Sequence, residues 1–163
     1  MNTRALLIAL AAVACATPVA ASAARYVGVV SHVTDGDTVW VRPTRGGPPQ
    51  QIRIDGIDAP EICQEFGAQS RDALVSFVLH KRVTVVTRAE DNYHRNVARI
   101  RVGREDVGLW MVSHGYAWSY RFRNDPGPYA RQETRARTAR LGLWNTGQAE
   151  IPRDFRVRHG SCH

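Results

Sequence analysis

Four acidic side chains lie close together in the sequence, on two short segments that also contain glycine or proline. Asp35 and Asp37 flank a glycine, and Asp58 and Glu61 flank an Ala-Pro pair. Clustered carboxylates repel one another, so their proximity is unfavourable unless a cation or a reaction compensates for it. Ligation by carboxylates, a backbone carbonyl and water suits Ca²⁺ or Mg²⁺ rather than zinc. The acids therefore predict a site for a hard divalent cation, although an Asp-Gly-Asp turn alone is common in ordinary polar turns.

Positive charge in this chain is carried almost entirely by arginine. The formal net charge is +7, and Lys81 is the only lysine. Arginine presents a planar set of donors that can grip a phosphate with two bonds, and a basic balance favours polyanions such as nucleic acid. Arginine-rich composition can also reflect the nucleotide bias of a genome. Arg53 is a clear candidate, because strand alternation puts Ile52 and Ile54 on one face and Arg53 on the other.

The segments that carry these residues have the patterns of short strands and helices. Five runs rich in β-branched residues predict strands, at residues 26–33, 38–41, 50–57, 83–87 and 97–102. Three segments with helical spacing and helix-ending signals predict helices, at residues 67–81, 106–115 and 128–140. Together they favour an α+β fold, a five-stranded OB-type β-barrel with three α-helices.

The N-terminal 23 residues have the architecture of a cleavable secretory signal peptide. Arg4 precedes an apolar run over residues 5–16, and the small residues Ala21-Ser22-Ala23 follow. The run is too short to span a bilayer, and the Ala-x-Ala pattern suits a signal peptidase. The alternatives are a buried N-terminal helix or, through Cys15, a lipoprotein signal. We therefore expect a secreted or periplasmic monomer without stable membrane association after cleavage.

Cys63 and Cys162 are the two cysteines that would remain after cleavage. In an oxidising compartment an even pair usually forms a disulfide. Neither cysteine has the neighbouring Cys or His that a zinc site requires. We expect a Cys63–Cys162 bridge that tethers the basic C-terminal tail, residues 146–163, beside the segment after Glu61; the alternative is two free thiols.

Taken together, the motifs resemble the thermonuclease family, also called the staphylococcal nuclease-like domain. The resemblance runs over residues 29–144 and rests on five motifs in a fixed order. They are Asp35-Gly36-Asp37-Thr38, Arg53-Ile54-Asp55-Gly56-Ile57-Asp58-Ala59-Pro60-Glu61, Asp91-Asn92-Tyr93-His94-Arg95, Gly115-Tyr116-Ala117 and Leu141-Gly142-Leu143-Trp144. The resemblance implies that residues 24–145 form an OB barrel with three helices. It also implies Ca²⁺-dependent hydrolysis of DNA and RNA to 3′-phosphorylated products.

The resemblance assigns the acids to the metal ion and to the attacking water. Asp37 and Asp58 would be carboxylate ligands of one Ca²⁺ ion, and the backbone carbonyl of Ala59 would be a further ligand. Glu61 would orient or deprotonate the water. These residue types suit phosphodiester hydrolysis, which needs an activated water, a cation and fixed positive charge near the reacting phosphate.

The resemblance assigns the arginines and tyrosines to the substrate. Arg53 and Arg95 would grip the scissile phosphate, and Tyr93 and Tyr120 would line the nucleotide pocket. His94 departs from the family pattern, because glycine is usual there and adopts positive φ at lower cost than histidine. This departure bears on the aim of Arg95.

Two further positions, Asn92 and Phe122, depart from the family pattern. Asn92 stands where the family more often has a basic or another polar residue, and Phe122 replaces a frequent tyrosine, which removes a hydroxyl from the pocket rim.

The main alternative is an OB-fold module that binds nucleic acid without cleaving it. A secreted basic structural or adhesion protein would have no use for the clustered acids. The joint presence of acids and arginines at all the matching positions favours the enzyme.

Overall fold

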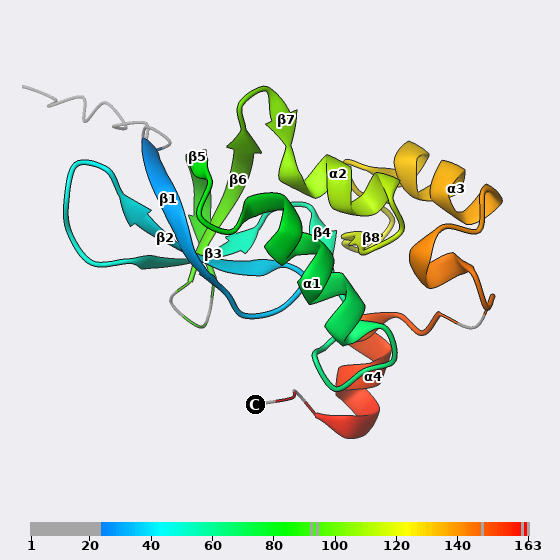
Figure 1. Ribbon diagram of the computed structural model, residues 1–163. Coiled ribbons are helices and arrows are strands. Elements are labelled where there is room, and N and C mark those ends of the chain that lie inside the picture. The colour runs from blue at the N-terminus through cyan, green and yellow to red at the C-terminus, as the bar shows by residue number, and fades with distance from the viewer. Residues whose placement is uncertain (1–23, 92, 94, 148, 161, 163) are drawn as a thin grey trace, which may run out of the picture.

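Five strands wind into a barrel in the first two thirds of the chain (Figure 1). The computed structural model describes residues 24–163 except 92, 94, 148, 161 and 163, so the expected signal peptide lies outside the described residues. The barrel strands are β1 (Arg25–Val33), β2 (Thr38–Pro43), β3 (Gln50–Ile54), β5 (Arg82–Glu90) and β6 (Asn96–Val102). Neighbours in the order β3-β2-β1-β5-β6 pair antiparallel, and a parallel β3–β6 pairing closes the barrel.

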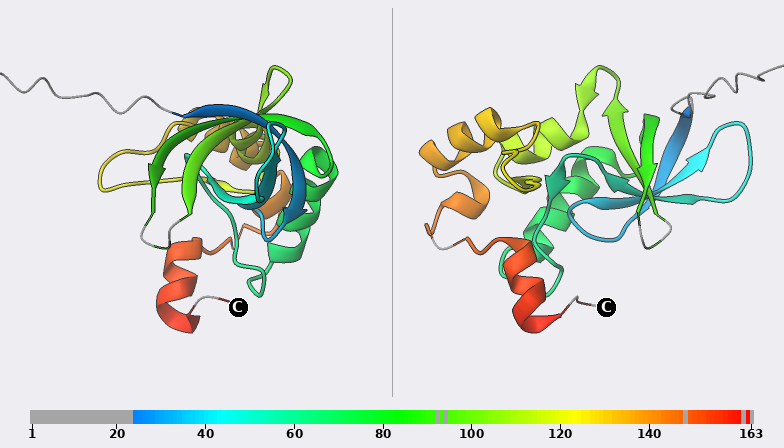
Figure 2. Two further views of the ribbon diagram at one scale, coloured as in Figure 1. Left: turned by 90° about the vertical axis from the view of Figure 1, so that its left-hand side faces the viewer. Right: turned by 180° about the vertical axis from the view of Figure 1, so that it is seen from behind.

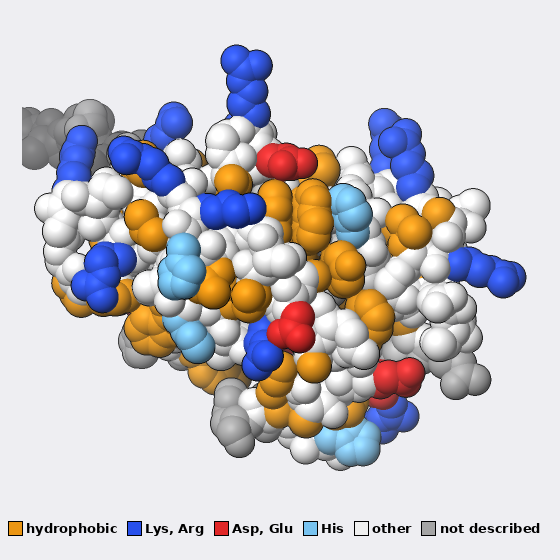
Figure 3. Space-filling view, viewed as in Figure 1, with side chains coloured by type: hydrophobic (Ala, Val, Ile, Leu, Met, Phe, Trp, Pro, Cys, Tyr) orange, Lys and Arg blue, Asp and Glu red, His pale blue; other side chains and the backbone are white. Residues whose placement is uncertain are grey.

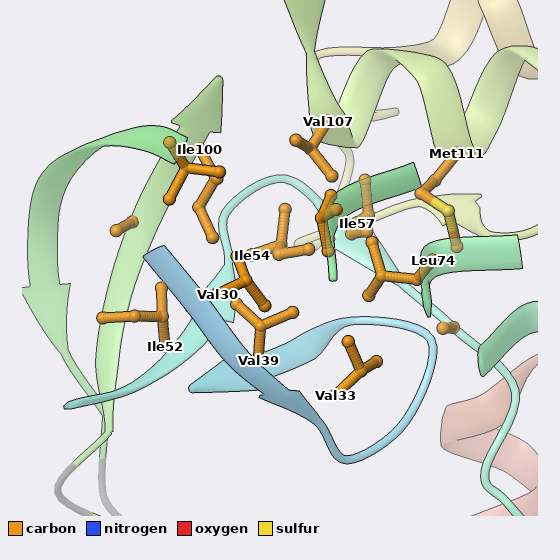
Figure 4. Close-up of a cluster of buried hydrophobic side chains, with 14 of the residues drawn as sticks. Val30, Val33, Val39, Ile52, Ile54, Ile57, Leu74, Ile100, Val107 and Met111 are labelled. Carbon is orange, nitrogen blue, oxygen red and sulfur yellow. The ribbon is translucent and has the colours of Figure 1, made fainter. Parts of the chain in front are cut away.

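Alternation along the strands sends one set of aliphatic side chains into the barrel. Val30, Val39 and Ile52 are completely buried, and Ile54 is nearly so. Figure 4 shows that this core continues beyond the barrel to Leu74, Val107 and Met111 on the helices. Because neighbouring residues of a strand point to opposite faces, the intervening Arg53 lies outside this core, as its alternation predicted.

Helices and short strands cover one side and one end of the barrel. The helices are α1 (Gly67–Val78), α2 (Val107–Ser113), α3 (Ala130–Thr138) and α4 (Pro152–His159), with a 3₁₀ turn η1 (Gly142–Trp144). The short strands are β4 (Ile57–Asp58), β7 (Glu105–Asp106) and β8 (Trp118–Ser119). The α+β class and the OB-type barrel are confirmed. The prediction of three helices is corrected to four α-helices in the described part of the chain, because the basic tail contains α4.

Local signals explain where α2 begins and how α3 is held. Asp106 caps α2, since its Oδ1 accepts a bond from Leu109 N at 3.0 Å. On α3 the carboxylate of Glu133 is buried and accepts a bond from Ser119 N of β8 at 2.9 Å. Trp118 and Trp144 pack edge to face next to this contact, with ring centroids 5.3 Å apart.

The last helix lies beside the loop that joins β4 to α1, away from the barrel strands (Figures 1 and 2). A disulfide between Cys63 in that loop and Cys162 after α4 joins the two segments, with the Cα atoms 5.9 Å apart. This is the pairing that the cysteine count favoured. Among the helices that the structure describes, none combines the length and apolar character needed to cross a membrane.

Candidate active site

The first acidic segment is the tight turn between β1 and β2. Asp35 Oδ1 accepts a bond from Asp37 N at 2.9 Å, which holds the turn in shape. Gly36 allows this turn to pack closely against the rest of the molecule. A Cβ atom there would collide with Ser70 Oγ and lie 2.7 Å from the Cβ atom of Ala59. The glycine thus brings the turn into contact with α1 and with the second acidic segment.

Asp37 is buried and accepts hydrogen bonds from three different residues. Its residue is 4% exposed. Oδ1 accepts a bond from Thr38 Oγ1 at 3.0 Å, and Oδ2 accepts bonds from Arg53 Nη1 at 2.6 Å and Ala59 N at 3.1 Å. A carboxylate held by three donors has a defined position, which a ligand or reacting group needs.

The second acidic segment is positioned by pairing and by two close backbone approaches. Asp58 lies on β4, which pairs with β8. Gly56 precedes it with φ +82°, in a turn where a Cβ atom would lie 2.6 Å from Pro128 Cγ. Gly67, the first residue of α1, lies so close to the carbonyl oxygen of Glu61 that a Cβ atom there would collide with it. Glycine at these two positions allows the chain to carry both acids to the same place.

Arg53 connects the two acidic segments. Nη1 bonds Asp37 Oδ2 at 2.6 Å, and Nη2 bonds Asp58 Oδ1 at 3.1 Å and Ile57 O at 3.3 Å. Its side chain is 19% exposed, whereas the two aspartates are 6% and 7% exposed. The guanidinium is therefore the inner positive charge of the site.

Arg95 is held in place by its own loop. Asp91 Oδ1 accepts bonds from the backbone N–H groups of Tyr93 at 2.9 Å and Arg95 at 3.0 Å. Oδ2 accepts a bond from Arg95 Nε at 2.8 Å. The Arg95 guanidinium carbon also lies 5.3 Å from the centroid of the Tyr93 ring. The departures at Asn92 and His94 lie outside the described residues, but Asp91 orients the Arg95 side chain through direct bonds.

A third arginine, which the sequence did not single out, reaches the acids from α4. Arg156 Nη1 bonds Glu61 Oε1 at 2.8 Å. Both terminal nitrogens also lie 3.4–3.5 Å from the Asp58 carboxylate. The signals for α4 were local ones: Pro152 at its start, basic residues in its last turn and Gly160 after it. They did not indicate where the helix lies.

Burial and mutual repulsion of the carboxylates shift the pKa values of the acids in this site. Burial, and then repulsion from Asp37, raise the pKa of Asp35 to about 7. Burial and the same repulsion raise the pKa of Asp58, although Arg53 and Arg156 oppose the shift. Burial would also raise the pKa of Asp37, but Arg53 and the donors to its carboxylate hold that pKa below its usual value. An added cation would be attracted to this cluster.

The donors at the cluster fit a hard cation with water ligands. The carboxylates of Asp37 and Asp58 meet at Arg53, and Ala59 is bonded to Asp37 through its N–H group. Within the described ranges, no three His, Cys, Asp or Glu side chains are arranged as a metal cage. The set expected from the sequence has two carboxylates and one backbone carbonyl, so water would complete the shell of an ion such as Ca²⁺ or Mg²⁺.

An open pocket of about 880 Å³ brings the candidate residues together. Its lining includes seven of the residues that the sequence indicated and one that it did not: Asp37, Arg53, Ala59, Glu61, Tyr93, Arg95, Tyr120 and Arg156. Asp58 lies beneath this surface, bonded to Arg53 and Arg156. Tyr93 and Tyr120 are 78% and 45% exposed, so their rings are accessible to a ligand at the rim.

Comparison with known proteins gives a consistent relationship. The family model described as "Staphylococcal nuclease homologue" matches residues 51–146. The chain is 32% identical to the micrococcal nuclease of Shigella flexneri over 164 residues, which cover 92% of this chain and 93% of that protein. It is 32% identical to an uncharacterized endonuclease of Haemophilus influenzae over 128 residues, covering 78% of this chain and 71% of that protein.

A longer plant protein is also similar. The chain is 37% identical over 106 residues to the probable staphylococcal-like nuclease CAN4 of Oryza sativa subsp. japonica, covering 65% of this chain but 21% of that protein. The match to the family model covers more than half of the chain. The chain belongs to the staphylococcal nuclease family.

Proposed function

We propose that this nuclease is a metal-dependent phosphodiesterase that cleaves both DNA and RNA and leaves 3′-phosphorylated products. One observation carries the proposal: Asp37, Arg53, Glu61 and Arg95 line one open pocket, and Asp58 lies beneath its surface, joined to Asp37 by Arg53. A binding module would gain nothing from burying acids where a nucleic acid must approach, since they repel its phosphates. The same acids are useful if a cation and a water must be held at the scissile bond.

The proposed metal ligands are Asp37, Asp58 and the carbonyl of Ala59, and one Ca²⁺ ion is the proposed occupant. Bound there, the ion would supply positive charge to a phosphate oxygen and make a nearby water more acidic. Support comes from the oxygen-only donor set and from the closeness of two buried carboxylates: after burial, repulsion from Asp37 is the next cause that raises the pKa of Asp58.

The remaining residues act on the water and on the phosphate. Glu61 orients the water for attack on phosphorus or takes its proton. The bond from phosphorus to the 5′ oxygen breaks, and the leaving oxygen takes a proton from solvent to become a 5′-hydroxyl. Arg53 and Arg95 donate to the phosphate oxygens as negative charge grows on them. Tyr93 and Tyr120 receive the nucleoside at the rim, where an aromatic ring can stack on any base.

The surface charge agrees with a polyanionic substrate. The net charge is +7. On the face seen in Figure 3, Lys and Arg side chains project from many places and Asp and Glu side chains from few. Such a surface attracts nucleic acid from solution, and this attraction weakens as salt is added.

A digestion assay tests the function directly. Purified protein with Ca²⁺ should degrade end-labelled single-stranded DNA and RNA, and a chelator should stop both reactions. The fragments should become substrates for a polymerase only after phosphatase treatment, because a 3′-phosphate blocks extension. Glu61→Gln should lower the rate by about 10²–10⁴-fold. Binding of the labelled strand without metal-stimulated cleavage would refute the proposal and favour the non-catalytic OB module.

Export to an oxidising compartment is the proposed location, either periplasmic or extracellular. The signal-like N-terminal segment supports it. The Cys63–Cys162 disulfide supports it as well, because such bonds persist mainly outside the cytosol. Mass spectrometry of the exported protein should show a chain that begins at Ala24, and light scattering should show a monomer. A chain that retains residues 1–23 would contradict the proposed cleavage.

A further inference from the structure

The helix α4 is attached at both of its ends to the loop that joins β4 to α1 and carries Glu61. Before the helix, Gln64 Nε2 donates to Glu150 O at 2.7 Å, while Gln64 Oε1 accepts from Glu61 N at 3.2 Å. After the helix, the Cys63–Cys162 disulfide closes the other side. Gln64 is 6% exposed, so this connection is shielded from water. The loop and the C-terminal segment therefore form one unit.

Between these two attachments, Arg156 holds the Glu61 carboxylate. The Arg156 Nη1 to Glu61 Oε1 distance is 2.8 Å. Within the part of the chain that the structure describes, Arg156 is the one side chain with a hydrogen bond to that carboxylate. Glu61 itself lies on a loop, and its side chain is 18% exposed. Without Arg156, rotation of the Glu61 side chain would be opposed only by its packing.

We propose that Arg156 is a positioning residue of the active site: it fixes Glu61 through Oε1 and leaves Oε2 to the attacking water. The inference rests on the proposed function of Glu61. A catalytic carboxylate works best when a neighbouring group sets its orientation, as outer partners do for metal ligands. Here that partner comes from a helix 95 residues further along the chain.

The contact distances favour this role over the alternative that Arg156 occupies the proposed cation site and blocks it. The bond from Arg156 to Glu61 is short, whereas its contacts to Asp58, the proposed metal ligand, are 3.4–3.5 Å. A cation at Asp58 would therefore replace the weaker contacts and leave the stronger one in place. Arg53 bonds the proposed ligand acids at 2.6 and 3.1 Å, which is closer than Arg156 lies to Asp58. Because Arg53 is itself proposed to act on the substrate, an ion pair with these acids does not identify an arginine as an inhibitor.

The disulfide is the device that keeps Arg156 in reach. An isolated eight-residue helix is marginal in water, and α4 has Pro152 as its buried residue. Without the tether, the bond from Gln64, the packing of Pro152 and the bonds of Arg156 itself would be left to hold the helix. Cys162→Ser should then lower the rate in the same way as loss of Arg156, and the two changes together should cost little more than either alone.

The experiment compares four variants with the wild-type enzyme at saturating Ca²⁺. They are Arg156→Met, Arg156→Lys, Glu61→Gln and the double variant Glu61→Gln/Arg156→Met. Arg153→Met is the matched control, because Arg153 is an exposed arginine on the same helix. Each protein is assayed on single-stranded DNA and on bis(p-nitrophenyl) phosphate, a small diester without neighbouring phosphates. Thermal unfolding confirms that each variant is folded.

The expected result is a loss of kcat on both substrates. Arg156→Met should lower kcat by roughly 10–100-fold, the size usual for a group that orients a catalytic or metal-binding side chain. Arg156→Lys should recover part of it, Arg153→Met should match the wild type, and the double variant should be no slower than Glu61→Gln alone. If Arg156→Met does not fold, Arg156→Lys and Cys162→Ser carry the same comparison.

Several results would overturn the inference. An Arg156→Met enzyme as fast as the wild type would show that Glu61 needs no such partner, and a faster one would show that Arg156 obstructs the site. A loss confined to KM on DNA, with the small diester unaffected, would make Arg156 a contact to a distant phosphate. A wild-type enzyme without metal-stimulated hydrolysis would instead refute the proposed function, which separates the two failures.

Discussion

Replacing Arg53 by alanine should weaken both the fold and the reaction, and the two effects can be measured separately. The guanidinium lies between two nearly buried carboxylates, at 2.6 Å from Asp37 and 3.1 Å from Asp58. Removing one member of a buried ion pair usually costs about 3–5 kcal/mol. The pocket is open to water and Asp37 keeps two other donors, so we expect the lower end, about 3 kcal/mol.

The assay is thermal unfolding with and without Ca²⁺, followed by kinetics. A loss of about 3 kcal/mol in a domain of this size corresponds to a Tm lower by roughly 10 °C. Ca²⁺ at a hundred times its Kd should restore about 2.7 kcal/mol, since it binds the folded state. The rate should stay low under those conditions, with kcat down by about 10²–10³-fold, because a donor to the developing phosphate charge is gone.

Comparison with lysine sharpens this test. Arg53→Lys retains one positive charge but cannot bridge two carboxylates with a planar pair of donors. It should therefore be more stable than Arg53→Ala, yet nearly as slow. A metal-loaded Arg53→Ala enzyme within tenfold of the wild-type kcat would refute the assignment of Arg53 to the phosphate. An unchanged Tm in metal-free solution would refute the argument about the buried acids.

Three other outcomes are expected. Glu133→Ala should lower the free energy of unfolding in urea by about 3 kcal/mol, because a buried carboxylate that bonds Ser119 N is lost; exposed Glu105→Ala is its control, and equal losses would contradict the reasoning. Burial raises the pKa of Tyr26 to about 12, so its contribution to stability is present below the unfolded pKa of about 10 and is lost as pH rises towards 12. Tyr26→Phe should then reduce the loss of stability measured between pH 10 and 12, and a variant that follows the wild-type pH curve would exclude this source. Tyr120→Ala should raise KM for single-stranded DNA with little change in kcat, since base stacking is worth about 1–3 kcal/mol; unchanged KM would remove Tyr120 from the binding surface.

Local patterns were sufficient to predict the barrel strands and the direction of Arg53. The two-residue period of a strand separates Ile52 and Ile54 from Arg53 whatever the rest of the chain does. The Asp-Gly-Asp segment forms the expected turn because Asp35 bonds the backbone N–H of Asp37 two residues on. Such signals act over a few residues, and a sequence displays them directly.

Closure of the barrel depends on contacts that no local pattern displays. β3 pairs in parallel with β6, with Arg53 opposite Val97. This pairing brings the loop that carries Arg95 to the side of the barrel where Arg53 lies. Parallel strands need a long connection between them, and the residue pattern of neither strand indicates which strand it pairs with. The resemblance to a known family supplied that arrangement in advance.

The position of α4 was beyond the reach of both local patterns and the family resemblance. The resemblance ends at residue 144, and α4 is polar, with no apolar stripe that would mark a packing face. The cysteine pair did predict that the tail lies beside the segment after Glu61. What it could not predict is the orientation of an eight-residue helix within that tether, which decides whether Arg156 or a neighbour meets the acids.

The two arginines that meet the acids therefore depend on different parts of the structure. Arg53 belongs to β3 and is held by barrel pairing on both sides. The α4 segment that carries Arg156 is held by the disulfide, by one bond from Gln64 and by the packing of Pro152. Reduction of the disulfide should leave the barrel, the proposed metal ligands and Arg53 in place, while it releases the partner of Glu61. Under the proposed function, the barrel would hold the cation and the phosphate, whereas the orientation of Glu61 would depend on a cross-link that persists mainly in oxidising compartments.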